Sequence, residues 1–547
     1  MQEDWWKGKV IYQIYPRSFC DSNGDGIGDL RGIIRKLDYL KELGVDLLWI
    51  SPLYASPNYD NGYDISDYYA IHPDFGTMED FDRLVAEAKK WGLGILMDLV
   101  INHTSTAHPW FQKSIRKEEP YTDFYIWRPG RGKKKPNNWT GFFGGDTWEY
   151  VPERGEYYLH LFAKEQADLN FRNPRVIEAV EKVMDFWLAK GVMGFRCDVI
   201  NIIHKDSLEN GRFRPVLRGS EYYLSRPGLH SLLKRFHRNV WEKYRAYTVG
   251  ETVFVSPEEA KKLTNPKRGE LTAVFAFAHM ETDCFGVKWF PRPFSPARFF
   301  KVLAKWQEAL PWNTVYFENH DQPRSLSRFG DADRYPRESG KALALLLLSL
   351  RGTPFIYQGQ ELGMTNFDFT AMDQVEDVES HQVWGIVEKF HLPKRLYWKV
   401  MRAKSRDNAR TPMQWTGEAG GGFSTGRPWL GMNHNHVERN ADKEGQDPRS
   451  LLNFYRRLLA FHRSSPALRE GTFEELYRKG SVWAFARRSP EGERLRFVIN
   501  LSKTAKKSPI TGTCLFSSYE ETELGATLRP YEAALLGEES KSGKEEA

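Results

Sequence analysis

Short apolar runs and longer amphipathic stretches alternate along most of this chain. The short runs are rich in β-branched and aromatic residues and are bounded by polar or turn-forming positions, a pattern typical of buried parallel strands. Eight such runs predict strands at residues 10–14, 47–50, 94–100, 194–199, 247–251, 273–277, 314–317 and 354–358.

Between these runs, apolar residues recur with the helical period of about 3.6 residues. Asn173, Ser256 and Ser295 each precede a proline and are predicted N-caps, because proline is favoured in the first helical turn. The amphipathic stretches predict helices at residues 30–43, 78–91, 174–190, 229–244, 257–263, 296–310, 338–351 and 450–462. Eight strand and helix alternations indicate the α/β class and, within it, a (β/α)8 TIM barrel.

Two segments interrupt the barrel pattern, and another follows it. Residues 1–103 form the first part of the predicted barrel, and residues 104–167 form an insertion after the third strand that is expected to be a small irregular or β-rich domain. Residues 168–466 complete the barrel and include a loop-rich excursion at about 360–446. Residues 467–547 change to short strands, which predicts a C-terminal antiparallel β-sandwich that ends in a charged, disordered tail at 538–547.

The amino-acid composition argues against a nucleic-acid partner but does not identify the function. Aromatic residues make up 14 % of the chain, which suits stacking on sugar rings and equally suits an aromatic-rich core. The formal charge is only +6, with 78 basic and 72 acidic residues, so nucleic acid is not indicated as a partner. The basic run of Arg131, Lys133, Lys134 and Lys135 lies between prolines and is interpreted as a solvated loop tip.

Cysteine usage and hydropathy bear on the compartment. Cys20, Cys197, Cys284 and Cys514 are few and far apart, which fits neither a disulfide framework nor a zinc site. Residues 1–9 lack the apolar core of a signal peptide, and the longest apolar run, at 342–348, is far too short to span a bilayer. We therefore expect a cytoplasmic protein with no membrane partner.

Charged residues and histidines stand at the ends of several predicted strands. In a TIM barrel the active site forms at these carboxyl ends. A single such residue is usually solvated or ion-paired, but several placed together beside apolar runs, where an unpaired charge is costly, favour a functional site. The candidates are Asp98, His103, Arg196, Asp198, Glu251, His320 and Asp321.

The carboxylates among these candidates suit glycoside hydrolysis. That reaction requires one carboxyl group to protonate the leaving oxygen and another to attack the sugar or activate water. Arg196 stands two positions before Asp198, on the same face of a strand, where its charge would keep a nucleophilic carboxylate ionised. Glu251 follows Gly250, which allows close approach of a substrate, and is the candidate acid.

Five stretches resemble the signature regions of the α-amylase superfamily. Four are DLVINH at 98–103, GFRCDVIN at 194–201, VGE at 249–251 and FENHDQPR at 317–324. The fifth, QADLN at 166–170, is similar to the segment that marks the oligo-1,6-glucosidase branch. The resemblance implies the barrel fold, with Asp198 as nucleophile, Glu251 as acid and base, and Asp321 as the carboxylate that stabilises the transition state. It also implies sugar-binding roles for His103 and His320, and an orienting role for Arg196.

The resemblance extends to residues that bind the terminal sugar. The stretches NYDNGYD at 58–64 and SRDNARTPMQW at 405–415 are similar to those of exo-acting glucosidases. They imply that Asp60 and Arg410 clamp a terminal glucose, that Tyr63 stacks on its ring, and that Phe162 also lines the substrate site. A pocket closed at this end would remove one glucose at a time from a short oligosaccharide.

The stretch DSNGDGIGD at 21–29 spaces oxygen donors as a calcium loop does, with glycine at the tight turn. It is not an EF-hand, because Gly32 stands where the bidentate glutamate would be. The related glucosidases hold a structural Ca2+ here, and no organic cofactor is implied. By this resemblance the ligands are Asp21, Asn23, Asp25, Asp29 and the carbonyl of Ile27. A metal-free cluster of Asx turns is the alternative.

Several related activities remain open at this stage. Val199, after the nucleophile, favours α-1,6 bonds within this family, although α-1,4 bonds or sucrose are further candidates and the following ETV at 251–253 departs from the pattern common in this branch. A trehalose-6-phosphate hydrolase is the main alternative. Sucrose isomerases are disfavoured by SLSRFG at 325–330, and a non-catalytic transporter heavy chain by the retained carboxylates. The oligomeric state is not indicated.

Overall fold

The computed structural model describes residues 4–130, 132 and 134–537 of the chain. The predicted charged tail at 538–547 lies outside the described residues. So do Arg131 and Lys133 of the predicted basic loop tip.

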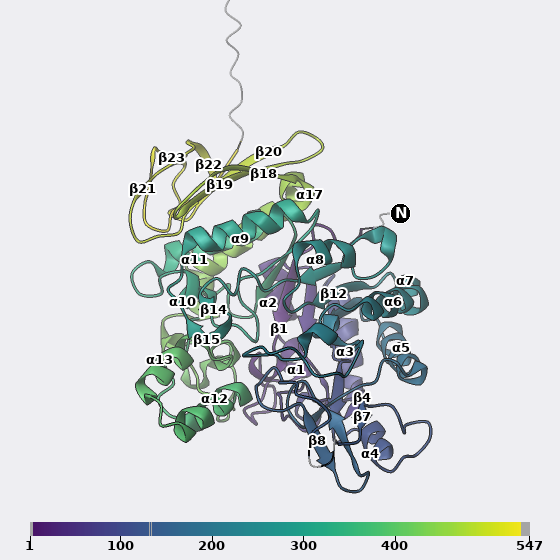
Figure 1. The fold of residues 1–547 in the computed structure, drawn as a ribbon. Coiled ribbons are helices and arrows are strands. Elements are labelled where there is room, and N and C mark those ends of the chain that lie inside the picture. Colours follow the sequence, from purple (N-terminus) through teal and green to yellow (C-terminus); the bar gives the residue numbers. More distant parts are fainter. Residues whose placement is uncertain (1–3, 131, 133, 538–547) are drawn as a thin grey trace, which may run out of the picture.

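Eight parallel strands form the centre of the molecule (Figure 1), as the sequence predicts. Their spatial order is β13, β12, β11, β5, β2, β1, β17, β16. The two outer strands approach each other, because the Thr314 hydroxyl donates to the Val274 carbonyl at 2.8 Å and the Tyr316 hydroxyl to Ala276 at 3.0 Å, which nearly closes the barrel. The strands are β1 (Ile11–Ile14), β2 (Leu47–Ile50), β5 (Gly94–Leu99), β11 (Gly194–Cys197), β12 (Tyr247–Glu251), β13 (Ala273–Phe275), β16 (Thr314–Val315) and β17 (Thr353–Tyr357).

Helices surround this barrel and bury one apolar face each. In α3, for example, Phe81, Leu84 and Ala88 lie on one side at helical spacing and are buried. The helix predicted at 229–244 is divided, because a π-helical turn at His237–Trp241 separates α6 from α7. The surrounding helices are α1 (Leu30–Ile34), α2 (Leu37–Leu43), α3 (Met78–Lys90), α5 (Pro174–Ala189), α6 (Pro227–Phe236), α7 (Glu242–Tyr244), α8 (Pro257–Leu263), α9 (Pro296–Ala309), α11 (Pro336–Ser349) and α16 (Leu451–Ser464).

All three predicted residues occupy N-cap positions, and two of them make the capping hydrogen bond. The Asn173 side chain accepts a hydrogen bond from the second backbone N–H of α5, and Ser256 accepts one from the third of α8. Ser295 also occupies the N-cap position of α9, before Pro296, but its half-buried side chain makes no capping hydrogen bond.

The insertion after the third barrel strand is small and β-rich, as expected. It leaves the barrel through β6 (His103–Ser105) and returns through β10 (Gln166–Asp168), which pair antiparallel. Between them lie α4 (Pro109–Ile115) and a three-stranded antiparallel sheet of β7 (Trp127–Arg128), β9 (Glu156–Leu159) and β8 (Trp148–Val151). Buried Trp139 and Trp148 pack in one cluster with Tyr223, which comes from the loop after β11. The insertion is therefore fixed against the carboxyl end of the barrel.

The excursion at 360–446 contains more helix than the sequence predicts. It holds α12 (Val378–Lys389), α13 (Lys394–Lys404), α14 (Asp407–Arg410) and α15 (Ala441–Gln446). In Figure 1, α12 and α13 lie beside the hairpin of β14 (Cys284–Phe285) and β15 (Val287–Pro291). The amphipathic signal of α12 and α13 is masked because apolar side chains such as Ile386 and Leu396 are exposed.

The C-terminal part is an antiparallel β domain, as predicted. Its six-stranded sheet has one face against α9 and α11, where Trp483 packs on Phe300 with ring centroids 5.2 Å apart (Figure 1). A two-stranded sheet, β21 (Lys506–Lys507) with β24 (Thr527–Leu528), contributes Leu528 to the cluster on the other face. The large sheet comprises β18 (Thr472–Lys479), β19 (Val482–Arg488), β20 (Arg494–Asn500), β25 (Ala533–Leu536), β22 (Gly512–Ser517) and β23 (Glu523–Leu524), in that order.

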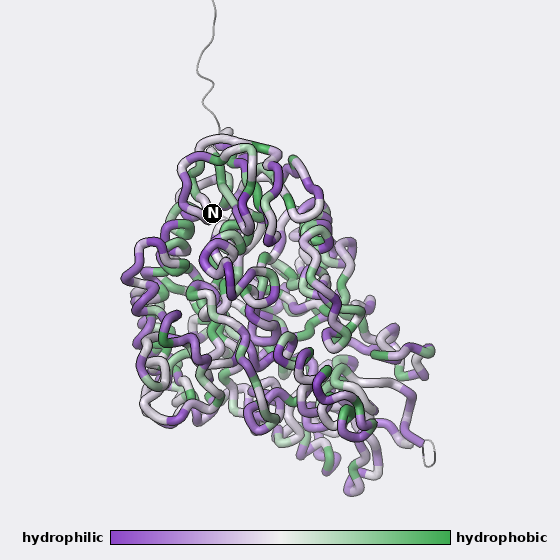
Figure 2. Tube along the Cα trace, turned by 90° about the vertical axis from the view of Figure 1, so that its left-hand side faces the viewer, coloured by the Kyte–Doolittle hydropathy of each residue, from purple (hydrophilic) through white to green (hydrophobic). Residues whose placement is uncertain are grey.

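Hydrophobic segments are short and alternate with hydrophilic ones throughout the fold (Figure 2). Among the described residues, no helix is long and apolar enough to cross a membrane. All four cysteines are described and free, so the expected absence of a disulfide framework is confirmed.

Candidate active site

The predicted strand-end residues converge at the carboxyl end of the barrel. In the register of β5 and β11, Arg196 lies directly beside Asp98. The side chains of His103, Asp198, Glu251 and Asp321 line one cavity. Asp98, Arg196 and His320 are buried behind them. The sequence therefore placed all seven residues at one site.

Arg196 lies at the centre of this site. Its Nη1 atom is 2.7 Å from Asp198 Oδ1 and its Nη2 atom is 2.8 Å from Glu251 Oε2. A third carboxylate, Asp98, contacts Nη1 at 2.5 Å from behind. One guanidinium group thus holds the two candidate catalytic carboxyl groups side by side, facing the same cavity.

Asp198 lies in a buried, charged environment next to Glu251 and Asp98. Burial raises the pKa of Asp198 well above its usual range; Arg196 opposes this shift, and the neighbouring charges of Glu251 and Asp98 add to it. Arg196 lowers the pKa of Asp198, in the direction that the sequence predicts, but burial outweighs its effect.

The backbone at Val199 is strained and helps to position Glu251. Val199 adopts φ +34° and ψ +40°, a left-handed conformation that is unfavourable for a β-branched residue. In this conformation its N–H donates a hydrogen bond of 3.0 Å to Glu251 Oε2. The residue after the candidate nucleophile thus orients the candidate acid.

Asp321 is the carboxylate that the site keeps ionised. Arg410 Nη2 lies 2.7 Å from Asp321 Oδ1, and Arg406 Nη1 lies 3.4 Å from the same atom. Burial alone would raise the pKa of Asp321, but the charges of His320, Arg406 and Arg410 lower it far below its usual range. An anionic group is therefore fixed at the cavity wall, able to accept hydrogen bonds from hydroxyl groups.

An ion pair closes one end of the cavity. Asp60, between β3 (Tyr54–Ala55) and β4 (Asp67–Ile71), contacts Arg406 at 3.2 Å. Phe143 of the insertion covers Arg406, with its ring centroid 5.5 Å from the guanidinium carbon. The resemblance implies that Asp60 and Arg410 clamp a terminal glucose, and the structure adds Arg406, which lies against Asp60. Arg406 and Arg410 lie one helical turn apart, and only Arg406 faces Asp60, whereas Arg410 faces Asp321.

Aromatic side chains form the remaining wall at the closed end. Tyr63 stacks on His320 with ring centroids 5.4 Å apart, and its hydroxyl lies 2.6 Å from His320 Nε2. Phe162 stacks on Phe142 at 4.8 Å. His103 lies 5.2 Å from the Phe162 ring, and burial lowers the pKa of this histidine to about 4. Tyr63, His103 and Phe162 line the cavity as predicted, whereas His320 lies behind Tyr63.

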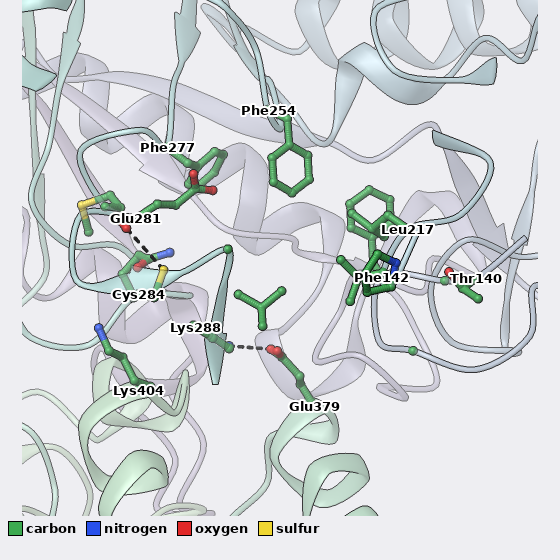
Figure 3. A pocket seen from close by; sticks show the side chains of 18 of the residues that line it. Thr140, Phe142, Leu217, Phe254, Phe277, Glu281, Cys284, Lys288, Glu379 and Lys404 are labelled. Atoms are coloured by element: carbon green, nitrogen blue, oxygen red, sulfur yellow. Dashed lines mark hydrogen bonds and ion pairs between the residues drawn. The ribbon is translucent and has the colours of Figure 1, made fainter. Parts of the chain in front are cut away.

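The sequence did not predict the residues at the open end. Lys288 of β15 and Glu379 of α12 form an ion pair of 2.5 Å, and both line the cavity and a pocket that adjoins it (Figure 3). Phe254, Phe277 and Glu281 line both spaces as well. The one indication of these segments in the sequence is general: loops at the carboxyl ends of barrel strands form the active site.

The predicted calcium loop is compact. Asp21 accepts backbone hydrogen bonds from residues 23, 24 and 26, and Asp29 caps α1. Within the described ranges, no three His, Cys, Asp or Glu side chains are grouped to hold a metal ion. A cation here would therefore depend on the Asn23 amide and the Ile27 carbonyl as well as on carboxylates, an all-oxygen donor set that suits Ca2+.

Comparison with known proteins identifies the family. The alpha-amylase catalytic domain matches residues 13–471. The chain belongs to the α-amylase family. This α-amylase family chain is 46 % identical to an oligo-1,6-glucosidase of Parageobacillus thermoglucosidasius, over 97 % of the chain and 99 % of that relative.

Comparison with solved structures supports the same family assignment. The crystal structure of Bacillus licheniformis trehalose-6-phosphate hydrolase superposes with a TM-score of 0.91 at 40 % identity, covering 97 % of this chain and 99 % of the other. Isomaltulose synthase from Klebsiella sp. LX3 superposes with a TM-score of 0.93 at 39 % identity, with the same coverage. This α-amylase family member is thus a glycoside hydrolase whose relatives act on different small sugars.

Proposed function

We propose that this enzyme is a retaining, exo-acting α-glucosidase that releases glucose from the non-reducing end of short α-1,6-linked oligosaccharides. The observation that carries the proposal is the contact of Asp198 and Glu251 with one guanidinium group, at 2.7 and 2.8 Å. Carboxyl groups this close leave no room for a water molecule between sugar and base, as an inverting mechanism needs. Close placement instead suits direct attack by one of them on the sugar.

The proposed reaction proceeds in two steps. Asp198 attacks the anomeric carbon while Glu251 protonates the leaving oxygen, which breaks the glycosidic bond and forms a glucosyl ester on Asp198. Glu251, now ionised, then removes a proton from water, and the resulting attack on the anomeric carbon frees glucose and restores Asp198. Asp321 accepts hydrogen bonds from sugar hydroxyls and stabilises the positive charge of both transition states.

The closed end supports exo action. Asp60, Arg406 and Phe143 come from three separate segments and meet where a longer glucan would have to continue. The terminal glucose would bind between this end and the catalytic pair, with Tyr63 and Phe162 beside its ring. Arg410 acts in this proposal through Asp321.

Three observations favour α-1,6-linked, uncharged substrates. Val199 follows the nucleophile, and the oligo-1,6-glucosidase relative is 46 % identical. In addition, each basic side chain that lines the cavity or the adjoining pocket in the described part of the chain is paired with a carboxylate. A phosphorylated substrate would find no unpaired cation there, which disfavours the trehalose-6-phosphate alternative. Sucrose and α-1,4-linked oligosaccharides are further candidates.

We also propose that the loop at 21–29 holds a structural Ca2+, through Asp21, Asn23, Asp25, Asp29 and the Ile27 carbonyl. Ca2+ should raise the melting temperature of the chelator-treated enzyme, and the exposed substitution Asp25→Asn should reduce that gain. A melting temperature insensitive to both chelator and Ca2+ would favour the metal-free cluster of Asx turns.

The test of the main proposal is glucose release from isomaltose, panose, maltose, sucrose, trehalose and trehalose 6-phosphate. We expect the highest kcat/KM for isomaltose or panose and, in Asp198→Asn, a loss of about 10^4-fold or more with an unchanged melting temperature. Activity confined to trehalose 6-phosphate would refute the proposed substrate class. Full activity of Asp198→Asn would refute the mechanism.

A further inference from the structure

The pocket that adjoins the catalytic cavity lies on the leaving-group side. It begins at the open end, beyond Lys288 and Glu379, and continues to the loop at 215–217. Because the glucose end is closed by Asp60 and Arg406, whatever is attached to the departing oxygen must extend in this direction. The walls of this pocket therefore contact the second sugar of the substrate proposed above.

The charges around this pocket are nearly all neutralised in pairs. Lys288 pairs with Glu379 at 2.5 Å. Arg328 and Lys404 both pair with Asp283, at 2.7 and 2.5 Å. Each lysine or arginine that lines the pocket in the described part of the chain is therefore already paired with a carboxylate and is not free to bind an anion.

Glu281 is the exception. Its side chain lines both the catalytic cavity and the adjoining pocket, and it makes no hydrogen bond or ion pair with any described residue. Its main chain is fixed, since its N–H donates to Phe277 at 3.1 Å and its carbonyl accepts from the Cys284 N–H and thiol, both at 3.3 Å. Figure 3 shows Glu281 beside Phe277, on the side of the pocket opposite Phe142 and Leu217. An exposed carboxylate on a fixed main chain thus faces the open space without a partner among the described residues.

We propose that Glu281 is a specificity-determining residue that selects uncharged, hydroxyl-rich leaving groups. The proposal rests on the α-glucosidase function argued above. A carboxylate accepts strong hydrogen bonds from hydroxyl groups, and the rings of Phe254 and Phe277 line the same space and offer apolar faces to the leaving sugar. The same charge repels an anionic group on the leaving sugar. Glu281 thereby favours a second glucose and penalises a phosphorylated or carboxylated one.

The experiment compares two matched pairs of substrates with the wild type and Glu281→Gln. The first pair is isomaltose and 4-nitrophenyl α-glucoside, whose leaving groups do and do not carry sugar hydroxyls. The second is 4-nitrophenyl and 4-carboxyphenyl α-glucoside, which compares a neutral with an anionic leaving group. In Glu281→Gln we expect kcat/KM for isomaltose to fall about tenfold relative to the nitrophenyl glucoside. The preference for the neutral over the anionic glucoside should fall by a similar factor.

Two control variants separate the possible outcomes. Glu281→Asp keeps the charge and should keep the preference for the neutral glucoside, even if its turnover falls. Glu258→Gln removes an exposed carboxylate at the start of α8 and should leave both ratios unchanged. Wild-type ratios in Glu281→Gln, or the same loss of preference in Glu281→Asp, would overturn the assignment. A wild type that fails on isomaltose would instead refute the proposed function.

Discussion

Asp98 lies behind Asp198 and Glu251 and contacts Arg196, the residue that holds both carboxyl groups. Burial raises its pKa to about 6, against the opposing charge of Arg196. The folded-state pKa is raised, so Asp98 is ionised above pH 6 and takes up a proton as the pH falls below it. Protonation removes the charge that holds Arg196 from behind. We expect kcat/KM for isomaltose to decrease as the pH is lowered through about 6.

The variant Asp98→Asn isolates this effect. Its kcat/KM at pH 7 should be about 100-fold lower, because a small displacement of Arg196 misplaces both carboxyl groups. The decrease near pH 6 should be absent from its profile. If the activity of the variant still decreases near pH 6, that decrease does not arise from Asp98 and the assignment is wrong.

At the scale of single residues, the sequence motifs predicted which residues meet at the site better than they predicted which side chains form ion pairs with each other. Asp198, Glu251 and Asp321 could be predicted because barrel geometry brings strand ends together. The partner of Asp60 could not, since Arg406 and Arg410 lie in the same motif and only the turn of α14 decides which of them faces the cavity. The raised pKa of Asp198 was also missed, because burial and the proximity of Glu251 are properties of the assembled site.

At the scale of elements, one buried lysine joins three segments near the catalytic cavity. Lys205, in the loop after β11, contacts Asp168 of β10 at 2.5 Å and the Asn102 side chain at 2.8 Å. Asn102 in turn lies 3.2 Å from His103 Nδ1. Lys205→Met leaves a buried carboxylate unpaired, so we expect the free energy of unfolding to fall by about 3 kcal/mol.

Urea denaturation and kcat/KM measurements check this expectation. Activity should fall together with stability, because Asn102 and His103 lose their fixed position. Lys243→Met is the matched control, since Lys243 is exposed and its ion pair with Asp185 is solvated. Equal effects of the two substitutions would contradict the anchoring role of Lys205.

The elements themselves were predictable where one face is buried. The eight barrel strands are short and mostly apolar because both faces of a parallel sheet are covered. The two helices α12 and α13 were missed for the opposite reason: Ile386, Phe390 and Leu396 are 51 %, 62 % and 61 % exposed, and this obscures the apolar stripe. The hairpin of β14 and β15 is too short to give a pattern.

At the scale of the whole molecule, Arg487 joins the C-terminal sheet to the barrel helices. It is 1 % exposed and donates hydrogen bonds to the carbonyls of Ser349, Leu468 and Gly471, at 2.8, 3.0 and 3.0 Å. Ser349 ends α11, and the other two lie at the end of α17 (Pro466–Glu470), where helices present unpaired carbonyl groups. Arg487→Met should lower the free energy of unfolding by about 3 kcal/mol.

Because Arg487 lies far from the cavity, kcat/KM of the folded variant should remain within about twofold of the wild type. The exposed neighbour Arg488 provides the control, and Arg488→Met should change neither quantity. A large loss of activity in Arg487→Met at full folding would show that the C-terminal domain also controls the active site.

The ion pair of Asp60 and Arg406 has a consequence for the order of events in each turnover. A cavity with a single opening admits and discharges molecules along one path, and the leaving group occupies that path while glucose remains bound as an ester. The shortened sugar must therefore depart before water reacts, and glucose must leave last. Free glucose should accordingly compete with substrate for the empty enzyme, so that accumulating product slows the enzyme through the same opening by which its substrate enters.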